Sequence, residues 1–194
     1  MTSFDDGSIL TLEPLIDAIR RGVEARGWSL SGLQKTTSHQ FEGRWEGEST
    51  RSAYLFFHPD DGPDFVSVDV YLDETGRGLT GNLALVVDLV QLGTMGDAER
   101  ALGAFADASA RELDQRHKRP ITLRLRLLDA AHETVEAETE VRFKVRIPKR
   151  AIAAGGGGVA AFADETVRGF ERLLGAPEIS RFSPPEAPNG TPIP

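Results

Sequence analysis

The sequence predicts an α+β fold in which three helices accompany an antiparallel sheet built from a meander and a long hairpin. Apolar residues alternate with polar ones over residues 121–147, and in three other segments they recur every three to four positions. A period of two is typical of a strand with one buried face, and a period near 3.6 is typical of an amphipathic helix. Because the strands follow one another in runs, the order helix–strands–helix–hairpin–helix favours antiparallel pairing over parallel winding.

The first helix is expected over residues 11–26, where Leu12, Leu15 and Ile19 share one face and Gly27 ends the pattern. A meander of four or five strands is expected to follow it. The candidate strands, separated by turns rich in Asp, Gly and Pro, are residues 28–34, 39–46, 52–58, 65–73 and 79–91. The third of these is a dense aromatic and apolar run, which is typical of a central strand.

Two further helices lie on either side of the hairpin. Asp97 can cap a helix over residues 97–117, and Pro120 ends it. The other helix is expected over residues 159–174, with Gly175 as its C-terminal cap.

The chain is predicted to hold one domain between two flexible ends. Six of its eleven prolines fall in the eighteen residues from 177 to 194, a composition typical of an extended segment. The expected organisation is a flexible N-terminus (1–10), a single α+β domain (11–175) and a Pro-rich disordered tail (176–194).

The composition is that of a soluble globular protein. The chain has 194 residues, of which 40% are hydrophobic and 27% charged, and its apolar runs are far shorter than the ~20 residues that span a bilayer. The first seven residues are acidic and lack the basic and apolar regions of a secretory signal. The sequence has no cysteine, which excludes disulfides, thiolate nucleophiles and cysteine zinc sites, and a cytoplasmic location is expected.

The net charge of −8 is spread unevenly. Between Arg116 and Arg150 ten Lys and Arg stand against five Asp and Glu, so this stretch carries +5 and the remainder −13. An acidic body disfavours general adhesion to nucleic acid or anionic membrane, whereas a local basic face could recruit an acidic partner.

Within the hairpin, arginines of the first strand are predicted to pair with glutamates of the second. Arg126 faces Glu136 in one register and Glu138 after a slip of two residues. Arg124 then faces Glu138 or Glu140. Either register matches opposite charges, which stabilises the strands by about 0.2–1 kcal/mol per pair and helps to fix their alignment. The predicted structural ion pairs therefore involve Arg124, Arg126, Glu136, Glu138 and Glu140.

Basic residues that follow the glutamates form the candidate partner-binding group: Arg142, Lys144, Arg146, Lys149 and Arg150. The first three share the solvent face of the second hairpin strand. Two outcomes are open for them. They pair with an acidic neighbouring strand, for which the face of Asp69 and Asp73 is the candidate, or they form an open basic patch.

No residue is assigned to catalysis or to metal binding, and no cofactor is expected. The four histidines are scattered without ligand spacing. The loop at residues 58–64 collects three carboxylates and an imidazole, but its spacing matches no calcium loop. The chain contains neither a Gly-x-Ser-x-Gly elbow nor a P-loop. These features favour a protein without catalytic activity.

Two features carry alternative interpretations. The glycine run at residues 155–158 is interpreted as a flexible hinge, and an anion site at a helix N-terminus is the alternative. Trp28, Trp45 and residues 56–57 are interpreted as core, and an aromatic groove with a basic rim is the alternative. Stacking of nucleic-acid bases requires aromatic side chains on the face that carries the cations. In the hairpin Phe143 lies opposite Arg142, which disfavours that function.

The order of elements resembles the type III secretion chaperone-like fold, which includes small bacterial cytosolic regulators and runs helix, three strands, helix, two strands, helix. The matching segments are residues 12–26, strands among 52–91, then 97–117, 121–128 with 135–147, and 159–174. The chain differs by one or two additional strands before the second helix and by the Pro-rich tail. The resemblance, carried by element order over most of residues 10–175, implies a homodimer that binds extended segments of partner proteins without catalysis.

We therefore expect a non-enzymatic protein-binding module of the chaperone or adaptor type that forms a homodimer. One alternative is an anion- or nucleic-acid-binding domain that uses the basic face of residues 135–150. The other is a small ligand-binding protein or enzyme with a pocket between sheet and helices.

Overall fold

The computed structural model describes residues 11–38, 50–88, 98–112, 122–126 and 138–180. In chain order the elements are α1 (Leu12–Glu24), β1 (Trp28–Ser38), β2 (Thr50–Pro59), β3 (Val66–Thr75), β4 (Gly78–Asp88), α2 (Ala98–Glu112), β5 (Thr122–Arg126), β6 (Glu138–Arg146), α3 (Lys149–Ala153), α4 (Gly155–Leu174) and α5 (Pro177–Ser180). The predicted α+β class and its order of helix, strands, helix, hairpin and helix are confirmed, with the short helices α3 and α5 on either side of α4.

Several expected segments lie outside the described residues. They are the strand at 39–46 with Trp45, the end of the second helix at 113–117, the tip of the hairpin at 127–137, the N-terminus at 1–10 and the tail from 181.

The strands form one antiparallel sheet in the order β1-β2-β3-β4-β6-β5. The meander β1–β4 follows chain order, and β6 then pairs with β4, so that β5 lies at the edge. The strand that carries the candidate cations therefore lies between β4 and β5. Its residues 140–142 pair with both neighbours, whereas residues 143–146 pair only with β4 among the described strands. Strand addition is blocked where both sides of β6 are paired.

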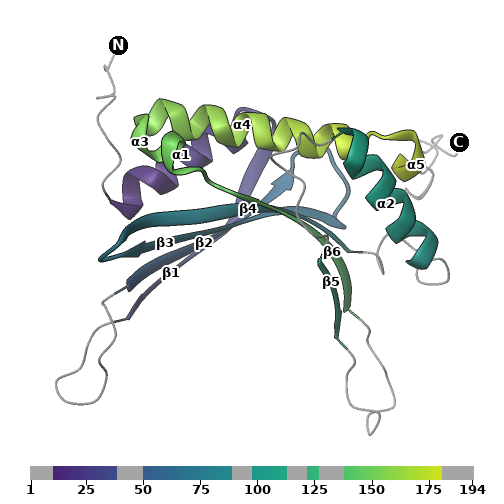
Figure 1. The fold of residues 1–194 in the computed structure, drawn as a ribbon, viewed down its shortest axis with the longest axis horizontal. Coiled ribbons are helices and arrows are strands. Elements are labelled where there is room, and N and C mark those ends of the chain that lie inside the picture. The colour runs from purple at the N-terminus through teal and green to yellow at the C-terminus, as the bar shows by residue number, and fades with distance from the viewer. Residues whose placement is uncertain (1–10, 39–49, 89–97, 113–121, 127–137, 181–194) are drawn as a thin grey trace, which may run out of the picture.

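The main helices pack on one face of the sheet. Figure 1 shows α1, α3 and α4 above that face, with the sheet bending away from them so that its other face is concave. On β3 the residues Val66, Val68, Val70 and Leu72 are buried against the helices. The helix α2 joins the same core, because the ring centroid of Phe105 lies 5.7 Å from that of Phe143 on β6.

A glycine permits the close packing of α1 on α4. A Cβ added at Gly22 would lie 2.2 Å from the carbonyl oxygen of Ala160 and 2.7 Å from the Cβ of Ala163. These distances are below van der Waals contact, so only a residue without a side chain fits. After α1, Gly27 adopts a φ of +74° and turns the chain into β1, as its role as a helix stop predicts.

Two predicted boundaries are wrong. The glycine run 155–158 is the first turn of α4, rather than a hinge that precedes the helix, so α4 begins at Gly155. The domain also continues beyond residue 175. Ala176 and Ile179 are buried, and the short helix α5 packs against α2 and α4. Burial of apolar side chains outweighs the tail-like composition at this point, because Ile179 finds a core to enter.

We expect Gly22→Ala to lower the free energy of unfolding by about 1–3 kcal/mol, because the added methyl group forces α1 and α4 apart. The matched control is Gly103→Ala in α2, where an added Cβ meets nothing within 4 Å. That change should stabilise the protein by about 0.5–1 kcal/mol through helix propensity. Denaturant midpoints at unchanged slope measure both effects. A Gly22→Ala protein as stable as the wild type would contradict the close contact.

Candidate binding site on the open sheet face

The concave face of the sheet carries the candidate site, and no described helix packs on it. We call this surface the open face. Its residues alternate with the core residues along each strand. They are Ser52, Tyr54 and Phe56 on β2, Asp69, Tyr71 and Asp73 on β3, Thr80, Asn82 and Ala84 on β4, and Arg142, Lys144 and Arg146 on β6.

The strand register aligns these side chains in two rows across the sheet. One row runs through Tyr54, Tyr71, Asn82 and Arg146. The next row runs through Phe56, Asp69, Ala84 and Lys144. Each row is aromatic or acidic at the β2–β3 end, small or neutral over β4, and cationic at β6. The open face therefore has an aromatic side and a cationic side.

The aromatic side exposes large apolar surface to solvent. Tyr54 is 38% exposed and Phe56 37% exposed. The ring centroids of Tyr54 and Tyr71 are 4.9 Å apart with an interplanar angle of 46°, a tilted pair that supports both rings. Neighbouring exposed aromatic side chains of this kind are typical of interaction surfaces, where their burial against a partner stabilises the complex.

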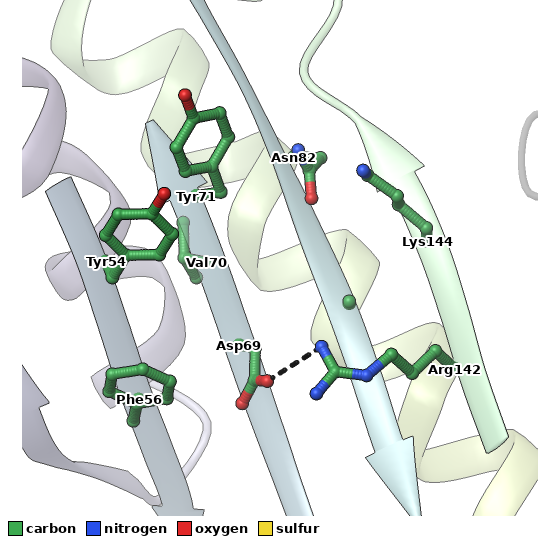
Figure 2. Close-up of a pocket in the computed structure, with 9 residues that line it drawn as sticks. Tyr54, Phe56, Asp69, Val70, Tyr71, Asn82, Arg142 and Lys144 are labelled. Atoms are coloured by element: carbon green, nitrogen blue, oxygen red, sulfur yellow. Dashed lines mark ion pairs between the residues drawn. The ribbon is translucent and has the colours of Figure 1, made fainter. Parts of the chain in front are cut away.

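The guanidinium of Arg142 crosses the sheet from β6 to β3. Its Nη1 lies 3.2 Å from Oδ2 of Asp69, and its Nε donates a hydrogen bond of 2.8 Å to Oε2 of Glu140. Figure 2 shows this side chain reaching over β4 toward Asp69, with the aromatic rings beyond. Arg142 pairs with Val86 of β4 and Asp69 pairs with Ala84, so the side chain crosses β4 diagonally between two adjacent rows.

Partial burial perturbs both members of this ion pair. Burial raises the pKa of the Asp69 carboxyl above its ordinary value, although a hydrogen bond from Ser67 and the charge of Arg142 oppose the shift. Burial alone would lower the pKa of the Arg142 guanidinium, but Glu140 and Asp69 outweigh it and the pKa is raised. Arg142 is thus held by two carboxylates and is not a free cation.

Lys144 and Arg146 differ from Arg142 because both are exposed. Neither makes an ion pair with any residue in the described part of the chain. Lys144 lines a hollow of about 460 Å³ together with Tyr54, Phe56 and Tyr71. A second hollow of about 300 Å³ continues from it toward Arg146, sharing Tyr71 and Lys144 as walls. Their combined size is that of a typical ligand site.

The five basic residues of the predicted partner-binding group therefore lie on two different surfaces. Arg142, Lys144 and Arg146 lie on the open face, and the first of them pairs with Asp69, the acidic strand face named as its candidate partner. Lys149 and Arg150 belong to α3, which packs beside α4 in the helix layer. These two residues are not part of the same surface.

The hairpin adopts the second of the two registers considered. Arg124 lies opposite Glu140, and Arg126 lies opposite Glu138. Glu136 lies outside the described residues. The charge pairing of these arginines stays a prediction, whereas Glu140 accepts a hydrogen bond from Arg142 on its own strand.

The sequence interpretation missed the aromatic part of the site. Residues 52–58 were expected to be a core strand, yet only Ala53, Leu55 and Phe57 face the core. The statement that aromatic and cationic side chains occupy different faces is wrong for the sheet as a whole, although it holds within β6. The alternation along β2 indicates their position from sequence alone, since Tyr54 and Phe56 occupy the positions between those core residues and so point to the other face.

Other candidate features do not form a site. Within the described ranges, no group of three or more His, Asp or Glu residues is arranged to hold a metal ion. In the 58–64 loop, Nδ1 of His58 lies 3.1 Å from the carbonyl oxygen of Val66, and Asp60 accepts a hydrogen bond from Ser29. A cavity of about 280 Å³ beneath α2 and α4 is lined by apolar side chains such as Phe65, Val87 and Phe105.

Comparisons with protein-family models, with curated proteins and with solved structures find no match to this chain. None of the helices described has the length and apolar character needed to cross a membrane.

We expect Arg142→Gln to raise the pKa of Asp69 further, because it removes a cation that favours the ionised carboxyl while burial remains. Side-chain carboxyl chemical shifts in an NMR titration measure this, and Lys149→Gln in α3 is the control for loss of one positive charge. Since the folded-state pKa lies above the unfolded one, this carboxyl contributes stability below its unfolded pKa that is lost as pH rises through the folded value. Titration of Asp69 at or below its ordinary value would contradict the assignment.

Proposed function

We propose that this protein is a non-enzymatic protein-binding module of the chaperone or adaptor type, and that the open face of its sheet binds the partner. The observation that carries the proposal is the presence of exposed aromatic rings and exposed cations around one hollow, on a face that no described helix covers. Interfaces are enriched in aromatic residues and arginine, whose burial and hydrogen bonds contribute affinity, and charge complementarity orients the partner.

The open face suits an extended segment of a partner protein. Its strands β2, β3 and β4 lie between two neighbours, and β6 does so up to Arg142, so the groups that face a partner across these strands are side chains. A concave strip of side chains can accommodate a chain that lies across the strands. The resemblance in element order to type III secretion chaperones, which implies binding of extended segments, supports the same proposal.

A nucleic-acid-binding function is the second candidate, favoured by aromatic and cationic side chains that share the open face. The acidic residues on the same face weigh against it. Asp69, Asp73 and Glu140 lie among the cations, and a run of phosphates would meet them. The alternative of a small ligand between sheet and helices would use the apolar 280 Å³ cavity, or a hollow of about 420 Å³ between Trp28, the 59–63 turn and Glu171 of α4.

We expect a photo-reactive amino acid in place of Tyr54 to form covalent adducts with a small set of proteins in extract from the native cells. The control places the same group at Arg168, an exposed position of α4 in the helix layer. Mass spectrometry identifies the adducts, and free competitor protein should suppress them. Equal labelling from both positions, or none from Tyr54, would contradict the proposed surface.

We also propose that the chain forms a homodimer through β1. Within the described sheet β1 has a neighbour on one side only, and it is eleven residues long with Lys35 as its single charged residue. Leu33 on this strand is 43% exposed. Long edge strands with few charges pair readily with other strands. The cytoplasmic location stays a prediction of the sequence.

Leu33→Lys should convert the dimer to a monomer, because it removes apolar contact and places like charges at the paired edges. Light scattering coupled to gel filtration measures the mass at protein concentrations of tens of micromolar. The matched control is Ala161→Lys, which adds the same charge at an exposed position of α4. A wild-type protein that is monomeric under these conditions refutes the dimer.

A further inference from the structure

The open face carries its two kinds of binding group at a fixed separation, and this separation restricts the ligand. Resting on the protein-binding function proposed above, we infer that the open face recognises an extended acidic segment in which an aromatic or large apolar residue is followed or preceded, four positions away, by Asp or Glu.

The expected charge of the ligand depends on which cations of the open face have no carboxylate partner among the described residues. Arg142 is already bound to Asp69 and Glu140. Lys144 and Arg146 are exposed and have no carboxylate partner among the described residues. Figure 2 shows Lys144 beside Asn82, on the side of β4 opposite the tyrosines. The exposed positive charge of the face therefore lies at the β6 end of the two rows, where it fits a single carboxylate group, whereas Asp73 on β3 accepts a hydrogen bond from Ser52.

A carboxylate is favoured over a chain of phosphates by the acidic residues around these cations. Asp69 lies in the row of Lys144 and Glu140 lies on the same strand as the cations, while Asp73 pairs in the sheet with Thr80, which lines the second hollow. A polyanion long enough to reach both hollows would pass these carboxylates and be repelled. One side-chain carboxylate, by contrast, can reach Lys144 and Arg146 without approaching them.

The exposed aromatic rings indicate that the ligand also has an aromatic or large apolar side chain. Tyr54 and Phe56 stand side by side on β2, each more than one-third exposed, and Tyr71 flanks the first of them. Between these rings and the cations, β4 contributes Asn82 and Ala84, whose short side chains leave the hollow of about 460 Å³. A ring or branched side chain of the ligand can pack on the exposed rings of Tyr54 and Phe56 on β2, and the ligand backbone then crosses the hollow toward β6.

The spacing follows from sheet geometry. Adjacent strands lie about 4.8 Å apart, so the three steps from β2 through β3 and β4 to β6 span roughly 14 Å. An extended chain advances about 3.3 Å per residue, so residues four apart are roughly 13 Å apart and point to the same side. Residues two apart span roughly 7 Å, which falls short of the roughly 10 Å from β2 to β4. Residues three apart point to opposite sides. The segment therefore crosses the strands with its positions i and i+4 facing the sheet.

The test uses blocked nine-residue peptides of identical composition, with one Phe and one Glu in a Ser/Thr background. Their spacing is two, three or four residues. Binding to the full-length protein is followed by amide chemical shifts of Tyr54, Asn82 and Lys144. We expect the peptide with a spacing of four to bind on the order of tenfold more tightly than the other two, a factor that corresponds to about 1.4 kcal/mol.

The double variant Lys144→Gln/Arg146→Gln should lose most of this tenfold preference and should no longer distinguish Glu from Gln in the peptide. The matched control is Lys149→Gln/Arg150→Gln, which removes the same charge from α3 and should leave binding unchanged. Amide spectra of both variants establish that they are folded.

Open-face binding that is equal for all three spacings would overturn the inference and leave the protein-binding function standing. Absence of any open-face shift with these peptides would also overturn it, while adducts from the Tyr54 photo-cross-linker would still report a partner. A ten-nucleotide oligothymidylate that binds more tightly than every peptide, with steep salt dependence, would refute both the inference and the protein-binding function.

Discussion

The one-sided burial of the sheet is the constraint on which the rest of the structure depends. Because α1 and α4 cover one face, each strand must direct its apolar residues to that face and the alternate residues to the other. A slip of one residue in any strand would exchange the two sets. The register of β3 against β2 thus fixes both the buried Val68 and Val70 and the position of Tyr71 beside Tyr54. The strand register therefore determines both which side chains stabilise the core and which side chains form the open face.

The pairing of β6 with β4 gives the open face its second component. The hairpin follows α2 in the chain, so its cations come from a part of the sequence far from the aromatic residues of β2. Insertion of β6 next to β4 places Lys144 in the row of Phe56. The same placement lets Arg142 reach Asp69 diagonally across β4. This ion pair links the meander to the hairpin, and it neutralises one of the cations that could otherwise attract a ligand.

A face of this composition is more costly to expose than a fully polar one, since Tyr54 and Phe56 present ring surface to water. None of the described helices covers this face, since α1 and α4 pack on the other one. Exposed rings beside cations that have no ion-pair partner among the described residues can both contribute to binding, where the rings are removed from water and the cations acquire a counter-charge. The proposed partner supplies both, and its spacing reflects the distance between strands.

The sequence by itself determined the α+β class, the order of elements and most strand parities, because periods of two and 3.6 are local consequences of burying one face. It also identified Asp69 as a candidate partner for the basic residues of β6. It did not determine the boundary at Gly155 or the burial of Ile179, since both depend on packing against distant elements. The open face itself was decided only by tertiary structure. Tyr54 and Lys144 are ninety residues apart in sequence, and the order of strands in the sheet alone brings them to one hollow.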